Sequence, residues 1–197
     1  MDIVSTLDYY NQNAEEYYNG TVEADVSKLY SRFEPLLPEH AKIIDIGCGS
    51  GRDSKHFIEA GYAVTAIDGS EELSRRAEKL IGIPVRCMLF NELDYDSEFD
   101  AAWACSSLLH VPKAEMPDVI HRICKALKPG GLFYASYKYG EQERQASGRA
   151  FSDYTEHDLP TLTDYGQGLS LVEYWISEDV RPGREHEKWL NIIWRKQ

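Results

Sequence analysis

Three glycines at alternate positions, Gly47, Gly49 and Gly51, form the clearest candidate for a ligand-binding loop in this chain of 197 residues. They directly follow an apolar run typical of a buried strand and precede an amphipathic stretch typical of a helix. Glycine lets the backbone turn sharply and lets a ligand approach without interference from a Cβ atom. The start of the helix then offers free amide donors and partial positive charge. The spacing therefore predicts a loop whose backbone approaches a bound ligand.

A carboxylate farther along the chain complements this loop. Asp68 ends the next apolar run after the glycine loop and its expected helix. In doubly wound α/β folds, an acid at this place accepts hydrogen bonds from ribose hydroxyls at the carboxyl edge of the sheet. The alternative is that Asp68 is only a turn residue before Gly69. The loop and the acid together predict a site for a ligand that contains ribose.

His110 is the best candidate for a side chain that transfers a proton. It follows the expected strand over residues 99–105, which places it at the same edge of the sheet as the glycine loop. Imidazole titrates near neutral pH and is therefore suited to general-base catalysis. The alternative is that His110 caps the next helix or braces its loop.

Three basic residues predict an anion site on the substrate side. Lys138 follows the expected strand over residues 132–137, and Arg181 and Arg184 lie in the loop between the last two expected strands. Arginine offers planar, bidentate donors to an anion. The alternative is that these side chains belong to a solvated hairpin tip. If they converge, we expect them to select a small anionic substrate.

Short apolar runs that alternate with amphipathic stretches must position these residues. The expected strands are 43–46, 62–67, 83–88, 99–105, 132–137, 170–177 and 189–195. The expected helices are 22–37, 52–60, 70–80, 113–127 and 155–163, and residues 138–153 are expected as a polar segment. The alternation predicts an α/β fold, a Rossmann-like doubly wound sheet of seven strands with helices on both faces. Because no helix separates the last two strands, we expect a mixed sheet with an antiparallel C-terminal hairpin.

The motifs, taken in order, resemble those of class I S-adenosylmethionine-dependent methyltransferases. They occupy residues 43–51, 66–70, 99–103, 108–112 and 126–131. The resemblance implies S-adenosylmethionine as cofactor, S-adenosylhomocysteine as product, and in-line methyl transfer to a small-molecule acceptor. Within the family, the chain is similar to small bacterial enzymes of the tellurite-resistance and type 11 methyltransferase groups.

The resemblance also assigns roles to residues of the cofactor site. Gly47 and Gly49 would approach the methionine part of the cofactor, Asp45 would orient the loop, and Asp68 would hold the ribose. The turn over residues 90–93 falls where the family contacts adenine, although it lacks the acidic residue often found at its start. The full expected cofactor set is Tyr10, Tyr17, Asp45, Gly47, Cys48, Gly49, Asp68, Phe90, Asn91, Ala104 and Cys105.

The N-terminal residues 1–38 are expected to form a helical lid segment of a single methyltransferase domain that spans residues 1–197. Tyr10 and Tyr17 are separated by about two helical turns, which would place both on one helical face above the cofactor. The alternative is an ordinary amphipathic packing segment.

Composition limits the partners and the compartment. The net charge of −12 opposes binding to nucleic acid, which requires basic residues. No apolar run approaches the roughly 20 residues of a membrane helix, and the first residues lack the features of a signal peptide, so we expect a cytoplasmic protein without membrane contact. The four cysteines form no CxxC pair, which favours reduced thiols and no metal site.

Three other functions would share some of these motifs. A nicotinamide-dependent oxidoreductase usually carries GxGxxG, whereas Arg52 and Asp53 follow Gly51 here. A non-catalytic module that binds S-adenosylmethionine would keep the loop and the acid. A transfer-RNA-modifying methyltransferase would share the motifs, but the acidic balance and the lack of a basic aromatic stretch oppose it.

Overall fold

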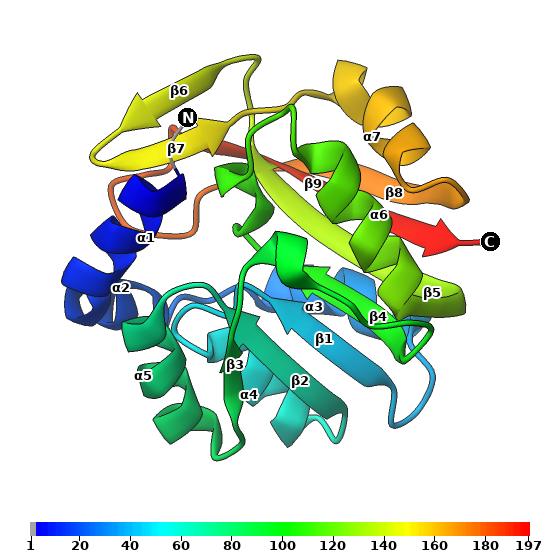
Figure 1. Cartoon of the computed structure of the whole chain (residues 1–197), viewed down its shortest axis with the longest axis horizontal. Coiled ribbons are helices and arrows are strands. Elements are labelled where there is room, and N and C mark those ends of the chain that lie inside the picture. The colour runs from blue at the N-terminus through cyan, green and yellow to red at the C-terminus, as the bar shows by residue number, and fades with distance from the viewer. Residues whose placement is uncertain (1–2) are drawn as a thin grey trace.

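Seven strands form one mixed sheet, in the order β3-β2-β1-β4-β5-β9-β8, in this computed structural model (Figure 1). The structure describes residues 3–197, so Met1 and Asp2 of the expected lid segment lie outside the described residues. The strands are β1 (Lys42–Ile46), β2 (Ala63–Asp68), β3 (Val85–Cys87), β4 (Phe99–Ala104), β5 (Leu127–Lys138), β8 (Leu169–Glu178) and β9 (Lys188–Lys196). Strands β1 to β5 run parallel, and β9 is antiparallel to both β5 and β8. The predicted mixed sheet with its C-terminal hairpin is confirmed.

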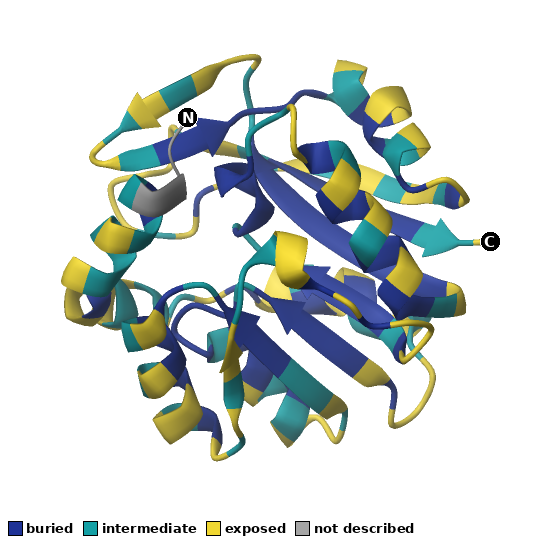
Figure 2. Ribbon diagram, viewed as in Figure 1, coloured by how far each residue is buried: buried dark blue, intermediate teal, exposed yellow. Residues whose placement is uncertain are grey.

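Helices cover both faces of the sheet, and Figure 2 shows the central strands buried between them. The helices are α1 (Ile3–Gln12), α2 (Ala14–Thr21), α3 (Ser27–Phe33), α4 (Arg52–Glu59), α5 (Glu71–Ile81), α6 (Met116–Ala126) and α7 (Leu159–Tyr165). One face packs against α6 and α7, and the other packs against α3, α4 and α5. Among residues 3–197, no helix is long and apolar enough to cross a membrane.

The central strand β1 shows why its sequence is an almost uninterrupted apolar run. Ile44 and Ile46 belong to the core beneath α6 and α7, whereas Ile43 belongs to the core beneath α3 and α4. All three side chains are 0% exposed. A strand buried on both faces requires apolar residues at successive positions. Asp45 is the exception, and it belongs to the site described below.

The order of the strands reverses beside β1, whose two neighbours are β2 and β4. In open α/β sheets, ligands bind in the crevice at the carboxyl ends of the strands at such a point. Figure 1 shows α1, α2 and the loop between β8 and β9 on the side to which the arrowheads of β1 and β2 point. The fold therefore encloses the edge at which the glycine loop and Asp68 lie.

The N-terminal region differs from the sequence-based expectation. The predicted helix over residues 22–37 is wrong at its start, because α3 begins only at Ser27 and two further helices precede it. The Asp25 carboxylate accepts a hydrogen bond from the backbone N–H of Ser27 (2.9 Å) and so satisfies a free donor at the start of α3. Val26 is buried without being helical, which explains the misleading apolar spacing.

A second small sheet was also missed. Residues 138–153 contain the antiparallel hairpin of β6 (Glu143–Ala146) and β7 (Arg149–Ser152). Its turn residues, Ser147 and Gly148, have φ of +49° and +76°. Two successive positive φ angles are what a type I′ hairpin turn requires. The charged composition of this segment hid a hairpin whose turn the Ser-Gly pair marks.

Candidate functional site

The glycine loop turns over the end of β2. The backbone N–H groups of Gly47 and Cys48 both donate to the Ile67 carbonyl at 2.9 Å. Gly47 has φ of +76°, and a Cβ atom there would lie only 2.5 Å from the Cβ of Ser107. Gly51, with φ of +82°, is the N-cap of α4. The loop therefore needs glycine both for its backbone angles and for its close approach to the end of β4.

Asp68 is bound to this loop at the end of β2. Its carboxylate accepts hydrogen bonds from the backbone N–H groups of Gly49 and Ser70, both at 2.8 Å. Burial raises the pKa of Asp68 above its ordinary value, and the two amide donors oppose that rise. The side chain is only 8% exposed, yet it lines a cavity. An acceptor held in this way is oriented before any ligand arrives.

This cavity, which we call the loop cavity, is narrow, with a volume of about 60 Å³. Its lining consists of Thr6, Leu7, Tyr10, Tyr17, Gly47, Gly49, Asp68, Gly69, Leu73, Met88, Leu89, Phe90, Ser106, Ser107 and His110. The structure thus brings seven of the residues singled out from the sequence to one place, together with apolar side chains that the sequence did not indicate.

Five expected cofactor residues do not line the loop cavity, and one of them, Asp45, is described in the next paragraph. Asn91 is exposed in a short 3-10 helix, and Ala104 is fully buried in the core with α6, so neither contributes to the lining of this cavity. Cys48 and Cys105 line a neighbouring cleft instead. Burial raises the pKa of Cys105 to about 12, so its thiol stays protonated at neutral pH.

Asp45 supports the loop from within the fold. It is 2% exposed and lines neither cavity, and its carboxylate accepts a hydrogen bond from Ser54 Oγ in α4 at 2.6 Å. Burial raises the pKa of Asp45, and the nearby charge of Asp53 adds to the rise. Asp45 thus connects the strand before the loop to the helix after it.

Helices α1 and α2 close over the loop cavity with two tyrosines. The Tyr10 and Tyr17 rings meet edge to face, with centroids 5.0 Å apart. A Cβ atom on Gly49 would lie 3.2 Å from the Tyr17 ring. The reason given from sequence was wrong, because the chain leaves helical geometry at Asn13 and the two tyrosines belong to different helices. Their convergence arises from the turn between these helices.

His110 lies where the loop cavity meets β7. Its Nδ1 is 2.6 Å from the Ala150 carbonyl, and its Nε2 is 2.7 Å from the Tyr10 hydroxyl. A carbonyl oxygen only accepts, so Nδ1 carries the hydrogen and Nε2 accepts from Tyr10. Burial lowers the pKa of His110 to about 4. The imidazole is therefore neutral at physiological pH, and its Nε2 lone pair accepts the hydrogen bond from Tyr10.

This burial predicts how stability depends on pH. The unfolded chain takes up a proton on His110 below pH 6.5, whereas the folded chain resists until about pH 4. The stabilisation is therefore complete above pH 6.5 and is lost as the pH falls toward 4. Between pH 6.5 and pH 4, the unfolding free energy measured by urea titration should fall by roughly 3 kcal/mol more in the wild type than in His110→Gln. His121→Gln, at an exposed position of α6, should parallel the wild type. A parallel decline for His110→Gln would contradict this prediction.

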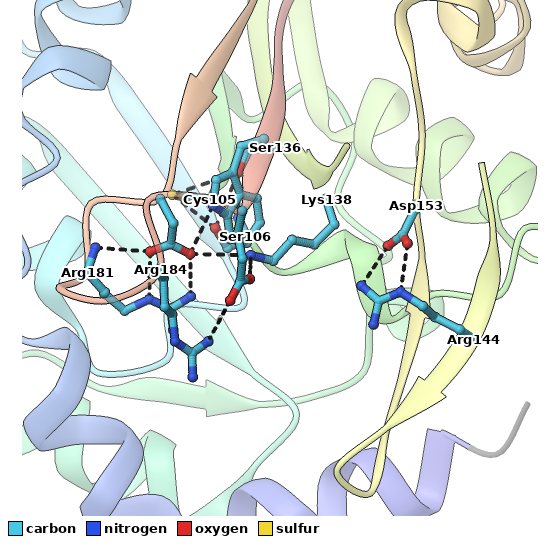
Figure 3. A network of polar contacts seen from close by, with 11 residues as sticks. Cys105, Ser106, Ser136, Lys138, Arg144, Asp153, Arg181 and Arg184 are labelled. Carbon is cyan, nitrogen blue, oxygen red and sulfur yellow. Dashed lines mark hydrogen bonds and ion pairs between the residues drawn. The ribbon is translucent and has the colours of Figure 1, made fainter. Parts of the chain in front are cut away.

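The three predicted substrate cations do converge, but carboxylates lie between them (Figure 3). Lys138 Nζ contacts Asp179 at 3.3 Å and also Glu187, and Arg181 donates to Asp179 at 2.6 Å. Arg184 lies 3.7 Å from Glu187. Burial would raise the pKa of Asp179, but Arg181 and Lys138 hold it below its ordinary range. The three cations therefore already have internal carboxylate partners, and their role in binding an anion stays a prediction.

The end of β4 carries backbone strain at the site. Ser106 has φ of +57°, a left-handed conformation that is uncommon outside glycine. Its backbone N–H donates to Ser136 Oγ at 2.8 Å, and the next residue, Ser107, donates through Oγ to the Ile46 carbonyl at 2.5 Å. Strained residues that their surroundings hold in place cluster at functional sites. The sequence pattern gave Ser107 no role.

A second concavity, the outer cleft, adjoins the loop cavity. It contains Lys138, Arg144, Arg149 and the loop between β8 and β9. The two concavities share part of their lining, namely Tyr10, Tyr17, Gly47, Ser106 and His110. Within residues 3–197, no group of three or more His, Cys, Asp or Glu side chains is arranged to hold a metal ion. The two concavities therefore meet at a wall formed by these shared residues.

Comparison with known proteins agrees with this geometry. Residues 43–131 match a family model described as a methyltransferase domain. The chain is 35% identical to a ubiquinone biosynthesis O-methyltransferase of Xanthomonas axonopodis pv. citri over 173 residues, which cover 79% of this chain and 71% of that protein. It spans about half the length of several other curated relatives that it matches. None of these relatives is named as a tellurite-resistance or type 11 methyltransferase, so the similarity of the chain to those two groups stays a prediction.

Solved structures show the same fold. The structure is similar to a Burkholderia thailandensis 1,6-didemethyltoxoflavin-N1-methyltransferase, with a TM-score of 0.73, 22% identity, and coverage of 97% of this chain and 85% of that one. The Bradyrhizobium japonicum N-methyltransferase NodS gives a TM-score of 0.71 at 17% identity, with 96% and 99% coverage. Three observations indicate the same family. They are the order of the motifs, the order of the strands in the sheet, and the curated relative that the chain covers over 71% of its length. The chain belongs to the class I S-adenosylmethionine-dependent methyltransferases.

Proposed function

We propose that this protein transfers the methyl group of S-adenosylmethionine to a small-molecule acceptor, by in-line displacement. One observation carries the proposal, namely that the loop cavity and the outer cleft share a wall. In-line transfer requires the donor on one side and the acceptor on the other, with the reacting atoms aligned. Two adjoining concavities meet that requirement.

The residues of the loop cavity fit the cofactor. The buried Asp68 carboxylate suits two ribose hydroxyls, and the crowding at Gly47 and Gly49 leaves room only for backbone beside the ligand. Met88, Leu89 and Phe90 offer an apolar surface for adenine. When bound, S-adenosylmethionine supplies an electrophilic methyl group. In this proposal α1 and α2 act as a lid that excludes water, with Tyr10 and Tyr17 facing the cofactor.

His110 has a defined but limited role in this proposal. Its Nε2 can take a proton that reaches it through the Tyr10 hydroxyl, 2.7 Å away. A base whose pKa is about 4 withdraws protons weakly at neutral pH. The site is thus better suited to an acceptor that is already deprotonated, which supports a small anionic substrate.

Charge and thiols support the remaining assignments. The net charge of −12 disfavours a nucleic-acid substrate. Cys48, Cys87, Cys105 and Cys124 are all free thiols. Free thiols fit a reducing compartment, so we place the protein in the cytoplasm.

A label-transfer assay tests the function. The purified protein is incubated with methyl-tritiated S-adenosylmethionine and with separate pools of bacterial small metabolites and of transfer RNA. We expect label in a small-molecule fraction and its suppression by added S-adenosylhomocysteine. Tight binding of S-adenosylhomocysteine without transfer to any pool would indicate a non-catalytic binding module. Label in transfer RNA would contradict the small-molecule acceptor.

A further inference from the structure

Arginines are the most frequent charged side chains of the outer cleft, and all but one of those in its lining are in ion pairs. The paired ones are Arg32 with Glu173, Arg52 with Asp53, Arg144 with Asp153, Arg181 with Asp179, and Arg184 with Glu187. Figure 3 shows Arg144 and Asp153 as a pair set apart from Lys138, Arg181 and Arg184. We call these three cations, with their partners Asp179 and Glu187, the Lys138 cluster. Arg149 is the exception, since no carboxylate of residues 3–197 lies within ion-pair distance of it.

The guanidinium of Arg149 lies among aromatic rings. It sits 4.4 Å from the Tyr9 centroid, 5.2 Å from that of Phe151 and 5.9 Å from that of Tyr10. Arg149 also makes a side-chain hydrogen bond to Tyr10, and neither this contact nor the rings neutralise its charge. In addition, Arg149 Nε is buried and has no hydrogen-bond partner. Unlike Arg76, whose Nε is also buried without a partner, Arg149 lines the outer cleft, where an acceptor from a bound molecule can reach it.

The hairpin of β6 and β7 places this cation beside the proposed reaction centre. Arg149 directly follows the type I′ turn and begins β7. The next residue, Ala150, donates its N–H to Thr6 Oγ1 in α1 at 2.9 Å, and its carbonyl binds His110 Nδ1. Arg149 is thus held next to the wall that the loop cavity and the outer cleft share.

We infer that Arg149 binds a carboxylate, or an oxyanion of similar shape, on the methyl acceptor. The guanidinium has no carboxylate partner among residues 3–197, its Nε is unsatisfied and it lies at the shared wall, and these three features point to this one ligand chemistry. The inference rests on the proposed function and refines it, because it moves anion recognition from the Lys138 cluster to β7. Arg149 would select the acceptor, and the fork of its guanidinium would fix the acceptor's orientation.

Titration calorimetry on the protein loaded with S-adenosylhomocysteine tests this inference. The probes are three matched pairs of an anion and its neutral amide, namely benzoate and benzamide, salicylate and salicylamide, and acetate and acetamide. We expect at least one carboxylate to bind roughly 10-fold more tightly than its amide. Arg149→Gln should remove this preference and leave the affinity for the amide unchanged, and Arg149→Lys should keep part of it.

Arg76→Gln is the matched control. Arg76 also has a buried Nε without a partner and also contacts the N-terminal helices, through Glu15, but it lines neither concavity. It should retain the full preference for carboxylates. Equal losses for carboxylates and amides in Arg149→Gln would show that Arg149 only packs against Tyr9 and would overturn the inference, as would a wild type without any preference. S-adenosylhomocysteine binding is measured first, so its failure would be recognised separately as a failure of the proposed function.

Discussion

Replacing Asp68 with alanine should weaken binding of S-adenosylhomocysteine by roughly 100-fold or more. The variant leaves the backbone N–H groups of Gly49 and Ser70 without the acceptor that each now contacts at 2.8 Å. It also removes the proposed acceptor for the ribose hydroxyls. Each buried donor left without a partner costs about 1–3 kcal/mol. The dissociation constant, measured by calorimetry, is the appropriate readout because the acceptor is not needed.

Asp100→Ala provides the matched control for this prediction. Like Asp68, Asp100 accepts a backbone hydrogen bond, from the Lys42 N–H at 2.9 Å, and it also pairs with Lys128 Nζ at 2.7 Å. It lies near the start of β4 and lines neither concavity. It should bind S-adenosylhomocysteine as the wild type does. A loss of less than about threefold in Asp68→Ala would remove Asp68 from the site, because even one lost hydrogen bond to a charged group exceeds that effect.

Gly47→Ala should both destabilise the fold and abolish cofactor binding. The added methyl would lie 2.5 Å from Ser107 Cβ and 3.3 Å from the Phe90 ring, at a backbone φ of +76°. The left-handed backbone alone costs about 1–2 kcal/mol for alanine, and the forced contact adds about 1–3 kcal/mol. We expect a loss of roughly 3 kcal/mol in unfolding free energy, measured by urea titration.

Gly82→Ala separates these two contributions. Gly82 ends α5 with φ of +72°, nearly the same backbone angle, but a Cβ there meets nothing within 4 Å. That variant should lose only the backbone contribution, about 1–2 kcal/mol, and should bind S-adenosylhomocysteine normally. Equal destabilisation in the two variants would show that the close approach of Gly47 to Ser107 carries no energetic weight.

The parts of the site that the sequence predicted well are those built from local patterns. Gly47, Gly49 and Asp68 follow strands whose apolar runs are unmistakable, so their place at the sheet edge follows from the alternation of strands and helices alone. Tyr10 and Tyr17 both line the loop cavity, but they do not share one helical face. The break at Asn13 brings their rings together.

The parts that the sequence missed depend on which side chains pair in space. Asp179 and Glu187 stand within the same loop region as Arg181 and Arg184, but spacing alone does not reveal that they neutralise Lys138 as well. Arg149 shows the converse case. It lies in a charged segment that resembles solvent-exposed chain, and its lack of an acidic partner becomes visible only when the hairpin is folded. Pairing between distant residues is decided by tertiary packing, which periodicity does not encode.

The position of α1 has a consequence for the order of events during turnover. Thr6, Leu7 and Tyr10 of this helix line the loop cavity, and Tyr10 also faces the outer cleft. A cofactor that enters or leaves must displace the helix, whose ties include Thr6 with Ala150 and Asn11 with Ser70. A molecule seated in the outer cleft would add contacts to the same helix and delay its opening. We therefore expect compulsory-order kinetics, in which the donor binds first and S-adenosylhomocysteine departs last.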